Sequence, residues 1–253
     1  MRTLLILFFS FFCSIVSIAN ESIDYENFNS ANLLYEEGDY KQATELYNRL
    51  LDKGYISDDL HYNLANSYFK TKDIAPAILH YERALKINPT NEDATNNLAL
   101  ANEKTVDKIE QVPELFFYRW FDSIVNIFTI DTWAKFAVGL FFIGLICFTL
   151  YLLTQTLQLK KLAFHSFSIV IILGLISWFM AFQQERSLKT QQYAIIMNPT
   201  VNINSSPSEG NSQLFVLHEG SKVKIKEEID GWFRVALPNG NEGWVEKIEL
   251  EAV

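Results

Sequence analysis

Asp39-Tyr40-Lys41-Gln42-Ala43, followed by Tyr47, returns 34 residues later as Asp73-Ile74-Ala75-Pro76-Ala77, followed by Tyr81. In both copies the alanine and the tyrosine are four residues apart, which places them on one face of an α-helix. A period of this length with helical spacing inside it is typical of stacked helix pairs. We therefore expect a helical repeat array in the first half of the chain.

The repeats expected from this period begin at Asp24, and a single capping helix closes them from Glu92 to about Lys108. The turn between the helices of the first pair falls at Gly38-Asp39, where a glycine can adopt a positive φ. Lys72-Asp73 holds the same place in the second pair. Small side chains that let two helices approach closely are expected at one position of each repeat: Ala31, Ala65 and Ala99.

The second repeat resembles a tetratricopeptide repeat (TPR), and the first matches that pattern less completely. The residues that carry the resemblance are Asn63-Leu64-Ala65-Asn66-Ser67-Tyr68, Ala77-Ile78, Tyr81, Ala84-Leu85 and Pro89. The resemblance implies a TPR domain over residues 24–110, an α-helical solenoid whose inner face binds segments of protein partners.

The inner face of such a solenoid supplies the candidate partner-binding residues. They are Asn32, Tyr35, Tyr62, Asn63, Asn66, Phe69, Lys70 and Asn97, with Phe28, Leu100 and Lys104 at flanking positions. Paired amides can clamp a peptide backbone because each offers a donor and an acceptor; alternatively, they pack helices or face solvent. One TPR variant grips a terminal carboxylate with lysines, but Phe28 and Asp93 stand at those positions here. A neutral, aromatic-rich or cationic segment therefore suits this face better.

The N-terminus has the pattern of an export signal. Met1 and Arg2 precede an apolar stretch, residues 4–18. The segment Val16-Ser17-Ile18-Ala19 closes it and has small residues at the two positions that a signal peptidase recognises. This predicts a signal peptide over residues 1–19; an uncleaved anchor is the alternative. Lipidation at Cys13 is not expected, because phenylalanines precede it.

Two apolar stretches, residues 132–154 and 162–182, are each long enough to cross a bilayer as a helix. The loop between them, residues 155–161, carries Lys160 and Lys161 and no acidic residue. The positive-inside rule places this loop in the cytoplasm, so the modules on either side face the periplasm across the inner membrane. Residues 111–131 are aromatic-rich but charged, which predicts an amphipathic interfacial segment; alternatively, these aromatics cap the repeat core.

From residue 193 to residue 253 the pattern changes to short strands separated by Gly, Pro, Asn and Ser turns. Five such strands predict a small β-barrel. Val201-Asn202-Ile203-Asn204-Ser205-Ser206-Pro207, Gly231-Trp232-Phe233-Arg234-Val235 and Gly240-Asn241-Glu242-Gly243-Trp244-Val245 resemble the strand motifs of bacterial SH3-like domains. Trp232 and Trp244 either form a surface for a peptide or cell-wall glycan peptide, or pack in the core.

The order of these modules is similar to that of BatE-type proteins, the E component of the Bacteroidetes aerotolerance (Bat) operon. The resemblance implies a cell-envelope complex with other Bat proteins, among them membrane-anchored von Willebrand A-type partners. It implies a scaffold without catalytic activity. The alternative is an envelope sensor or anchor whose SH3-like tail binds peptidoglycan.

Composition disfavours several other functions. A net charge of −9 opposes binding to nucleic acid, and two cysteines in apolar runs provide no disulfide framework. We find no pattern of nucleophile, phosphate loop or metal ligands, and we expect no enzyme, cofactor or metal site. His218 is expected to be exposed, and His61 and His80 fall at repeat positions that are variable or surface-facing, with no third metal ligand nearby in the pattern. The expected fold is thus a TPR solenoid, a two-helix transmembrane hairpin and an all-β SH3-like barrel.

Overall fold

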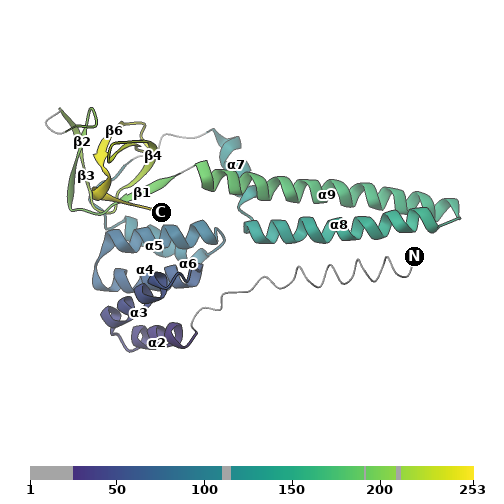
Figure 1. Cartoon of the computed structure of the whole chain (residues 1–253), viewed down its shortest axis with the longest axis horizontal. Helices are drawn as coiled ribbons and strands as arrows, with labels where there is room; N and C mark the ends of the chain where they lie inside the picture. The colour runs from purple at the N-terminus through teal and green to yellow at the C-terminus, as the bar shows by residue number, and fades with distance from the viewer. Residues whose placement is uncertain (1–24, 110–114, 191, 209–211) are drawn as a thin grey trace. The chain divides into compact units, whose positions relative to one another are not determined.

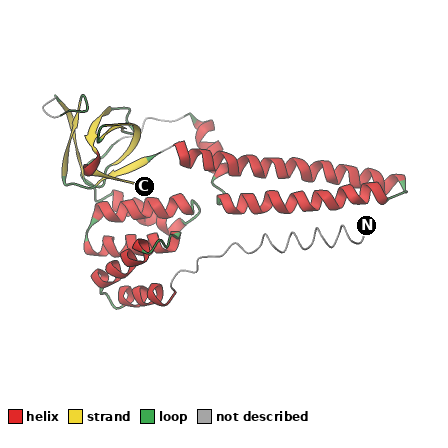
Figure 2. Ribbon diagram, in the orientation of Figure 1, coloured by secondary structure: helices red, strands yellow, loops and turns green. Residues whose placement is uncertain are grey.

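The computed structural model describes residues 25–109, 115–190, 192–208 and 212–253 (Figures 1 and 2). The signal peptide expected at residues 1–19, the first repeat residue Asp24 and residues 110–114 of the linker lie outside this part. The chain divides into two compact units, residues 1–56 and 57–253, and each is described by itself below.

In the described residues of the first unit, α2 (Tyr25–Glu36) and α3 (Tyr40–Asp52) form a helix pair. Ala31 and Ala43 are both fully buried, as close helix packing requires. Gly38 forms the turn with a φ of +87°, a conformation that costs glycine little. The Asp39 side chain then caps α3 by accepting a hydrogen bond from the backbone N–H of Gln42.

The second unit begins with α4 (Asp58–Thr71), α5 (Ile74–Ile87) and α6 (Glu92–Asn102). Ala65 of α4 and Ala77 of α5 are fully buried. Lys72 adopts a φ of +71° at the turn where the first repeat has a glycine. The second repeat therefore makes the same turn with a less suitable residue, because a side chain in the left-handed region costs about 1 kcal/mol or more.

The third predicted small-residue position is wrong. Ala99 is exposed, whereas Ala94 and Ala101 of the same helix are fully buried. Residues 103–109 form turns and loop, so α6 ends at Asn102 rather than near Lys108 and no second helix of its own repeat lies beside Ala99. The face of α6 that contacts the preceding pair is the one that is buried.

Three helices follow: α7 (Phe116–Val125), α8 (Ile130–Leu153) and α9 (Leu157–Thr190). By length and composition α8, with 24 residues, and α9, with 34 residues, could both cross a membrane. Only residues 154–156 separate them, so the expected loop over residues 155–161 is largely the first turn of α9. Residues 157–161 contain only good helix formers, which lets α9 start early.

Glycines set the contact between α8 and α9, which pack against each other as a hairpin (Figure 1). A Cβ at Gly144 would lie 3.2 Å from the Ile171 side chain, and one at Gly174 would lie 3.6 Å from that of Leu140. A Cβ at Gly139 would meet nothing within 4 Å. Gly144 and Gly174 therefore permit close helix approach, and Gly139 does not contribute to it.

The C-terminal domain is a seven-stranded antiparallel sheet. Its strands are β1 (Tyr193–Ile196), β2 (Thr200–Asn204), β3 (Gln213–His218), β4 (Lys222–Ile229), β5 (Trp232–Ala236), β6 (Glu242–Glu246) and β7 (Leu250–Ala252), in the order β3-β2-β6-β5-β4-β1-β7. The five expected strands are joined by β1 and β7, which pair with each other. Ile203, Val235 and Val245 are fully buried at its core. The structure thus confirms the predicted class: helical repeats, two long apolar helices and a β domain.

Candidate partner-binding site

Three of the predicted binding residues meet on α4 and α6. The Asn66 Oδ1 accepts hydrogen bonds from the Tyr81 hydroxyl, at 2.6 Å, and from the Asn97 Nδ2, at 3.0 Å. The Asn97 Nδ2 also donates to the Tyr62 hydroxyl, at 3.2 Å. These contacts fix both amides and leave the Asn66 Nδ2 and the Asn97 Oδ1 without a partner among the described residues.

The first unit contains the same hydrogen bond between a tyrosine and an asparagine. The Tyr47 hydroxyl donates to the Asn32 Oδ1 at 2.6 Å, with the same sequence separation of 15 residues as between Asn66 and Tyr81. Burial raises the pKa of Tyr47 well above its ordinary value, so this hydroxyl remains a donor. Tyr35 lies edge-on to Tyr40, with ring centroids 5.1 Å apart. Asn32 thus binds within its own helix pair through its carbonyl.

The remaining candidates differ in exposure. Asn63 and Phe69 are half-buried, and Phe69 packs against the apolar core formed by the helices of the second unit. Lys70, Leu100 and Lys104 are exposed. Phe28 packs against Tyr47, with ring centroids 6.0 Å apart. The structure therefore gathers Tyr62, Asn66 and Asn97 of the second unit into one hydrogen-bonded cluster, which we call the amide cluster.

Of the two alternatives for His61 and His80, a surface-facing position is wrong. Both are buried between α4 and α5, with their Nδ1 atoms 3.0 Å apart. Burial, with Arg83 nearby, lowers the pKa of His61 to about 4, and burial together with His61 lowers that of His80 to about 3. No third metal ligand joins the pair within the described residues. Helical spacing was the missed signal, because His61 precedes the buried Leu64 by three residues.

His218 is also not simply exposed. Its Nδ1 and its backbone N–H each lie 2.7 Å from a carboxylate oxygen of Asp107, which also accepts a 2.6 Å hydrogen bond from the Ser221 hydroxyl. Bonds from Ser221 and His218 lower the pKa of Asp107 despite its partial burial. We call Asp107, His218 and Ser221 the clasp, since they fasten the loop after α6 to the β domain.

Contacts between α5 and the β domain reinforce the clasp. Lys222 lies 2.6 Å from Glu82, and Arg83 lies 2.9 Å from Glu251. Ile195 of β1 is fully buried among the apolar side chains of the repeat. The β domain contacts α5 and the loop after α6, whereas Asn66 and Asn97 lie on α4 and α6. The β domain is therefore joined to the second repeat through α5 and the loop after α6. The two amides of the cluster lie on other elements, α4 and α6.

Both tryptophans of the β domain are half-buried and lie outside its buried core. Their neighbours Phe233 and Val245 point into the core, because successive strand residues face opposite sides of a sheet. Trp232 lines a cavity of about 350 Å³. The cavity is otherwise mostly polar, with Thr200, Val201, Asn202, Asn204, Gln213, Glu246 and Glu249.

Comparison with known families agrees with this architecture. The tetratricopeptide repeat model matches residues 59–91, and the bacterial SH3 domain model matches residues 199–250. No curated protein matches the chain. The chain therefore contains a TPR and a bacterial SH3 domain, both of them kinds of module that suggest protein–protein interaction.

Proposed function

We propose that this protein is a non-catalytic, membrane-anchored scaffold that binds a partner segment at the TPR amide cluster. The observation that carries the proposal is the fixed pair Asn66 and Asn97. Their mutual bond leaves one amide donor group and one acceptor, the two groups that an extended peptide backbone requires. Because Tyr62 and Tyr81 already hold these amides, binding costs little side-chain entropy.

The cluster can be tested with the full-length protein and the partners that co-purify with it. Asn66→Ala and Asn97→Ala each remove one of the available groups and should reduce partner recovery. Asn96→Ala is the matched control, since Asn96 is an exposed residue of the same helix without a partner among the described residues. Equal recovery from all three variants would contradict the proposal.

We propose that α8 and α9 cross the bacterial inner membrane and that both modules face the periplasm. The support is the hairpin itself: Lys160 and Lys161 lie beside its tip, and both modules join it at the other end. In intact cells, an impermeant maleimide should then label Asp93→Cys but not Gln158→Cys. The reverse pattern would place the modules in the cytoplasm.

We further propose that the partners are other Bat-operon membrane proteins of the von Willebrand A type, in an aerotolerance or stress complex. The support is the order of modules, with a TPR domain, an apolar hairpin and an SH3-like tail in one chain. Mass spectrometry of the co-purified proteins tests this. A reproducible partner set without any von Willebrand A-type protein would contradict it.

A second candidate function is binding of peptidoglycan by the β domain. The cavity beside Trp232 favours it, because an aromatic side chain among amides and carboxylates suits a glycan peptide. Sedimentation of the full-length protein with purified sacculi, and its loss in Trp232→Ala, would support this function. Failure of the unaltered protein to sediment would exclude it.

A further inference from the structure

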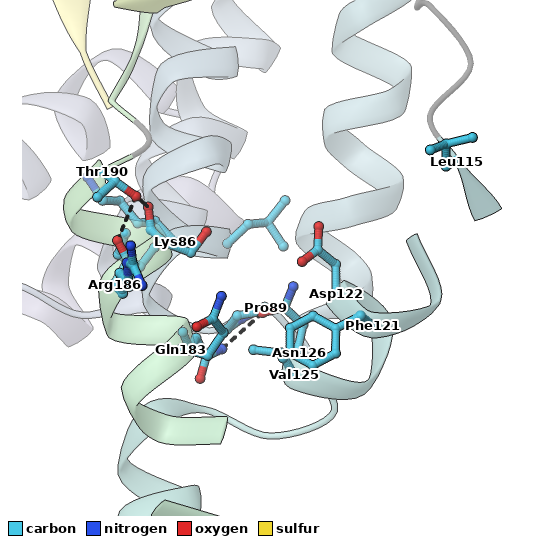
Figure 3. A pocket seen from close by; sticks show the side chains of 14 residues that line it. Lys86, Pro89, Leu115, Phe121, Asp122, Val125, Asn126, Gln183, Arg186 and Thr190 are labelled. Carbon is cyan, nitrogen blue, oxygen red and sulfur yellow. Dashed lines mark hydrogen bonds between the residues drawn. The ribbon is translucent and has the colours of Figure 1, made fainter. Parts of the chain in front are cut away.

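Two aromatic side chains of α7 face outward. On its inner side, Phe121 and Val125 lie toward α9 and line a cavity of about 950 Å³ (Figure 3). Val125 is only 4% exposed, whereas Phe116 and Trp120 are 77% and 67% exposed. Phe116 and Trp120 are four residues apart and therefore share one side of the helix. We call this pair the aromatic side of α7.

The aromatic side does not cap the repeat core, which was one of the two alternatives for this segment. Among the described residues, the apolar core formed by the helices of the second repeat includes no side chain of α7. Apolar groups that gather in an exposed position mark a contact with a membrane or with another protein. The surroundings of α7 decide between these two partners.

Hydrogen bonds to both long helices fix the end of α7. The Nε1 of Trp133 in α8 donates to the carbonyl oxygen of Val125 at 2.9 Å. The Nε2 of Gln184 in α9, a residue that is only 4% exposed, donates to the Oδ1 of Asn126 at 3.1 Å. The apolar stretch of α9 ends at Phe182, two residues before Gln184. In the proposed membrane hairpin, these bonds therefore hold α7 at the level of the lipid headgroups.

The apolar surface continues from α7 onto the span. Ile127 and Phe128, between α7 and α8, are both exposed. The ring of Phe128 lies edge-on to that of Phe136 in α8, with centroids 5.3 Å apart, and Phe136 is itself exposed. A bilayer that surrounds α8 therefore also meets these side chains. This continuity favours a lipid surface over a protein as the partner of α7.

The charged residues of α7 lie away from its aromatic side. Arg119 directly precedes Trp120, and Asp122 follows it by two residues, so they are turned from it by about 100° and 200° around the helix axis. Both residues are exposed. Aromatic rings on one side and charged groups on another are typical of helices that lie in a membrane interface.

We propose that α7 lies flat in the headgroup region of the bilayer at this end of the hairpin, with Phe116 and Trp120 inserted between headgroups and acyl chains and Arg119 toward water. The helix would then fix the depth of α8 and α9 in the membrane, because a shift along the membrane normal would expose both rings to water or move Arg119 into the acyl chains. This proposal rests on the proposed membrane hairpin. It is independent of the scaffold role and of which side of the membrane the modules face.

Fluorescence quenching in the full-length protein, reconstituted in phosphatidylcholine nanodiscs, tests the insertion. In a Cys13→Ser/Cys147→Ser background, Trp120→Cys and, separately, Phe116→Cys each carry an NBD label. Lipids with a nitroxide near the headgroup should quench both labels, and aqueous iodide should quench them little. Arg119→Cys is the matched control at the adjacent position, and iodide should quench its label several times more strongly.

A label at Ile143→Cys, an exposed position midway along α8, separates this proposal from the hairpin itself. Lipids with a nitroxide near the end of the acyl chain should quench it if α8 spans the membrane. With that label quenched, equal iodide quenching at Trp120→Cys, Phe116→Cys and Arg119→Cys would overturn the insertion of α7 alone. Labels at Trp120→Cys and Phe116→Cys that neither lipid nitroxide nor iodide reaches would show a protein cover and would overturn it as well. Without lipid quenching at Ile143→Cys the proposed hairpin fails, and the insertion of α7 fails with it.

Discussion

The hydroxyl of Tyr81 donates a 2.6 Å hydrogen bond to the Oδ1 of Asn66, across the two helices of the second repeat. Tyr47 and Asn32 form the same bond, at the same length, in the first unit. Each tyrosine is 1% exposed or less, so each hydroxyl needs an acceptor inside the protein. The asparagine therefore accepts the buried tyrosine proton with its oxygen, and in the second repeat the Nδ2 of Asn66 has no partner among the described residues.

Removal of the Tyr81 hydroxyl should lower the stability of the second repeat. Tyr81→Phe leaves the Asn66 Oδ1 with Asn97 as its donor, and loss of one buried hydrogen bond costs about 1 kcal/mol. We expect a lower midpoint of thermal unfolding by circular dichroism. Tyr55→Phe is the control, because the Tyr55 hydroxyl has no partner among the described residues; an equal decrease in both variants would argue against the bond.

The buried histidine pair should make the repeat sensitive to acid. The folded pKa values of His61 and His80, about 4 and about 3, lie below the ordinary value of 6.5. The unfolded state therefore binds more protons below pH 6.5, and the free energy of unfolding should fall by up to about 1.4 kcal/mol per pH unit for each histidine. Above pH 6.5 this contribution is constant.

Hydrogen exchange of α4 and α5, corrected for the intrinsic pH dependence, measures this effect between pH 7 and pH 5. His80→Gln removes one titrating group and should flatten the pH dependence. If the unaltered protein protects these helices equally at both pH values, the histidines do not control their stability.

Asp107 should hold the β domain to the repeat. Asp107→Asn removes a charged acceptor that serves His218 and Ser221, and hydrogen bonds to charged groups contribute about 1.5–3 kcal/mol. Faster hydrogen exchange is expected in β3 and in residues 102–109. Asp93→Asn, at an exposed position without a partner among the described residues, should leave exchange unchanged. Unchanged exchange in Asp107→Asn would show that other contacts hold the β domain to the repeat without Asp107.

Two glycines of the hairpin, one at the contact between α8 and α9 and one away from it, allow that contact to be tested. Gly144→Leu forces a side chain against Ile171, and overpacking of this kind costs about 1–3 kcal/mol. Gly139→Leu places the same side chain where a Cβ meets nothing within 4 Å. In detergent, the first variant should unfold at a lower temperature than the second. Equal unfolding temperatures would contradict the packing of α8 against α9 at Gly144.

The sequence predicted the elements that repeat or alternate: Ala65 is buried at its predicted close-packing position, and Ala77 and Tyr81, which share a helix face by their spacing, are buried together. It failed where burial depends on a missing neighbour: Ala99 is exposed because residues 103–109 do not continue as helix. It also missed polar contacts between distant segments. Asp107 and His218 are 111 residues apart, and no local pattern joins a loop to a strand at that distance.

The binding face was predicted as a set of residues but not as a network. Helical positions identified Asn66 and Asn97, yet their mutual bond and the role of Tyr81 depend on side-chain geometry. The buried Gln184, whose Oε1 has no hydrogen-bond partner among the described residues, had no signal in the sequence beyond being a polar residue after an apolar span.

The most direct test of the scaffold is affinity purification of tagged full-length protein from native membranes, beside the Asn66→Ala/Asn97→Ala variant and the Asn96→Ala control. Co-purified proteins are identified by mass spectrometry, and equal circular dichroism shows that the variants are folded. We expect partners with the unaltered protein and with Asn96→Ala, and their loss with the double variant. The same partners in all three samples would contradict binding at the amide cluster.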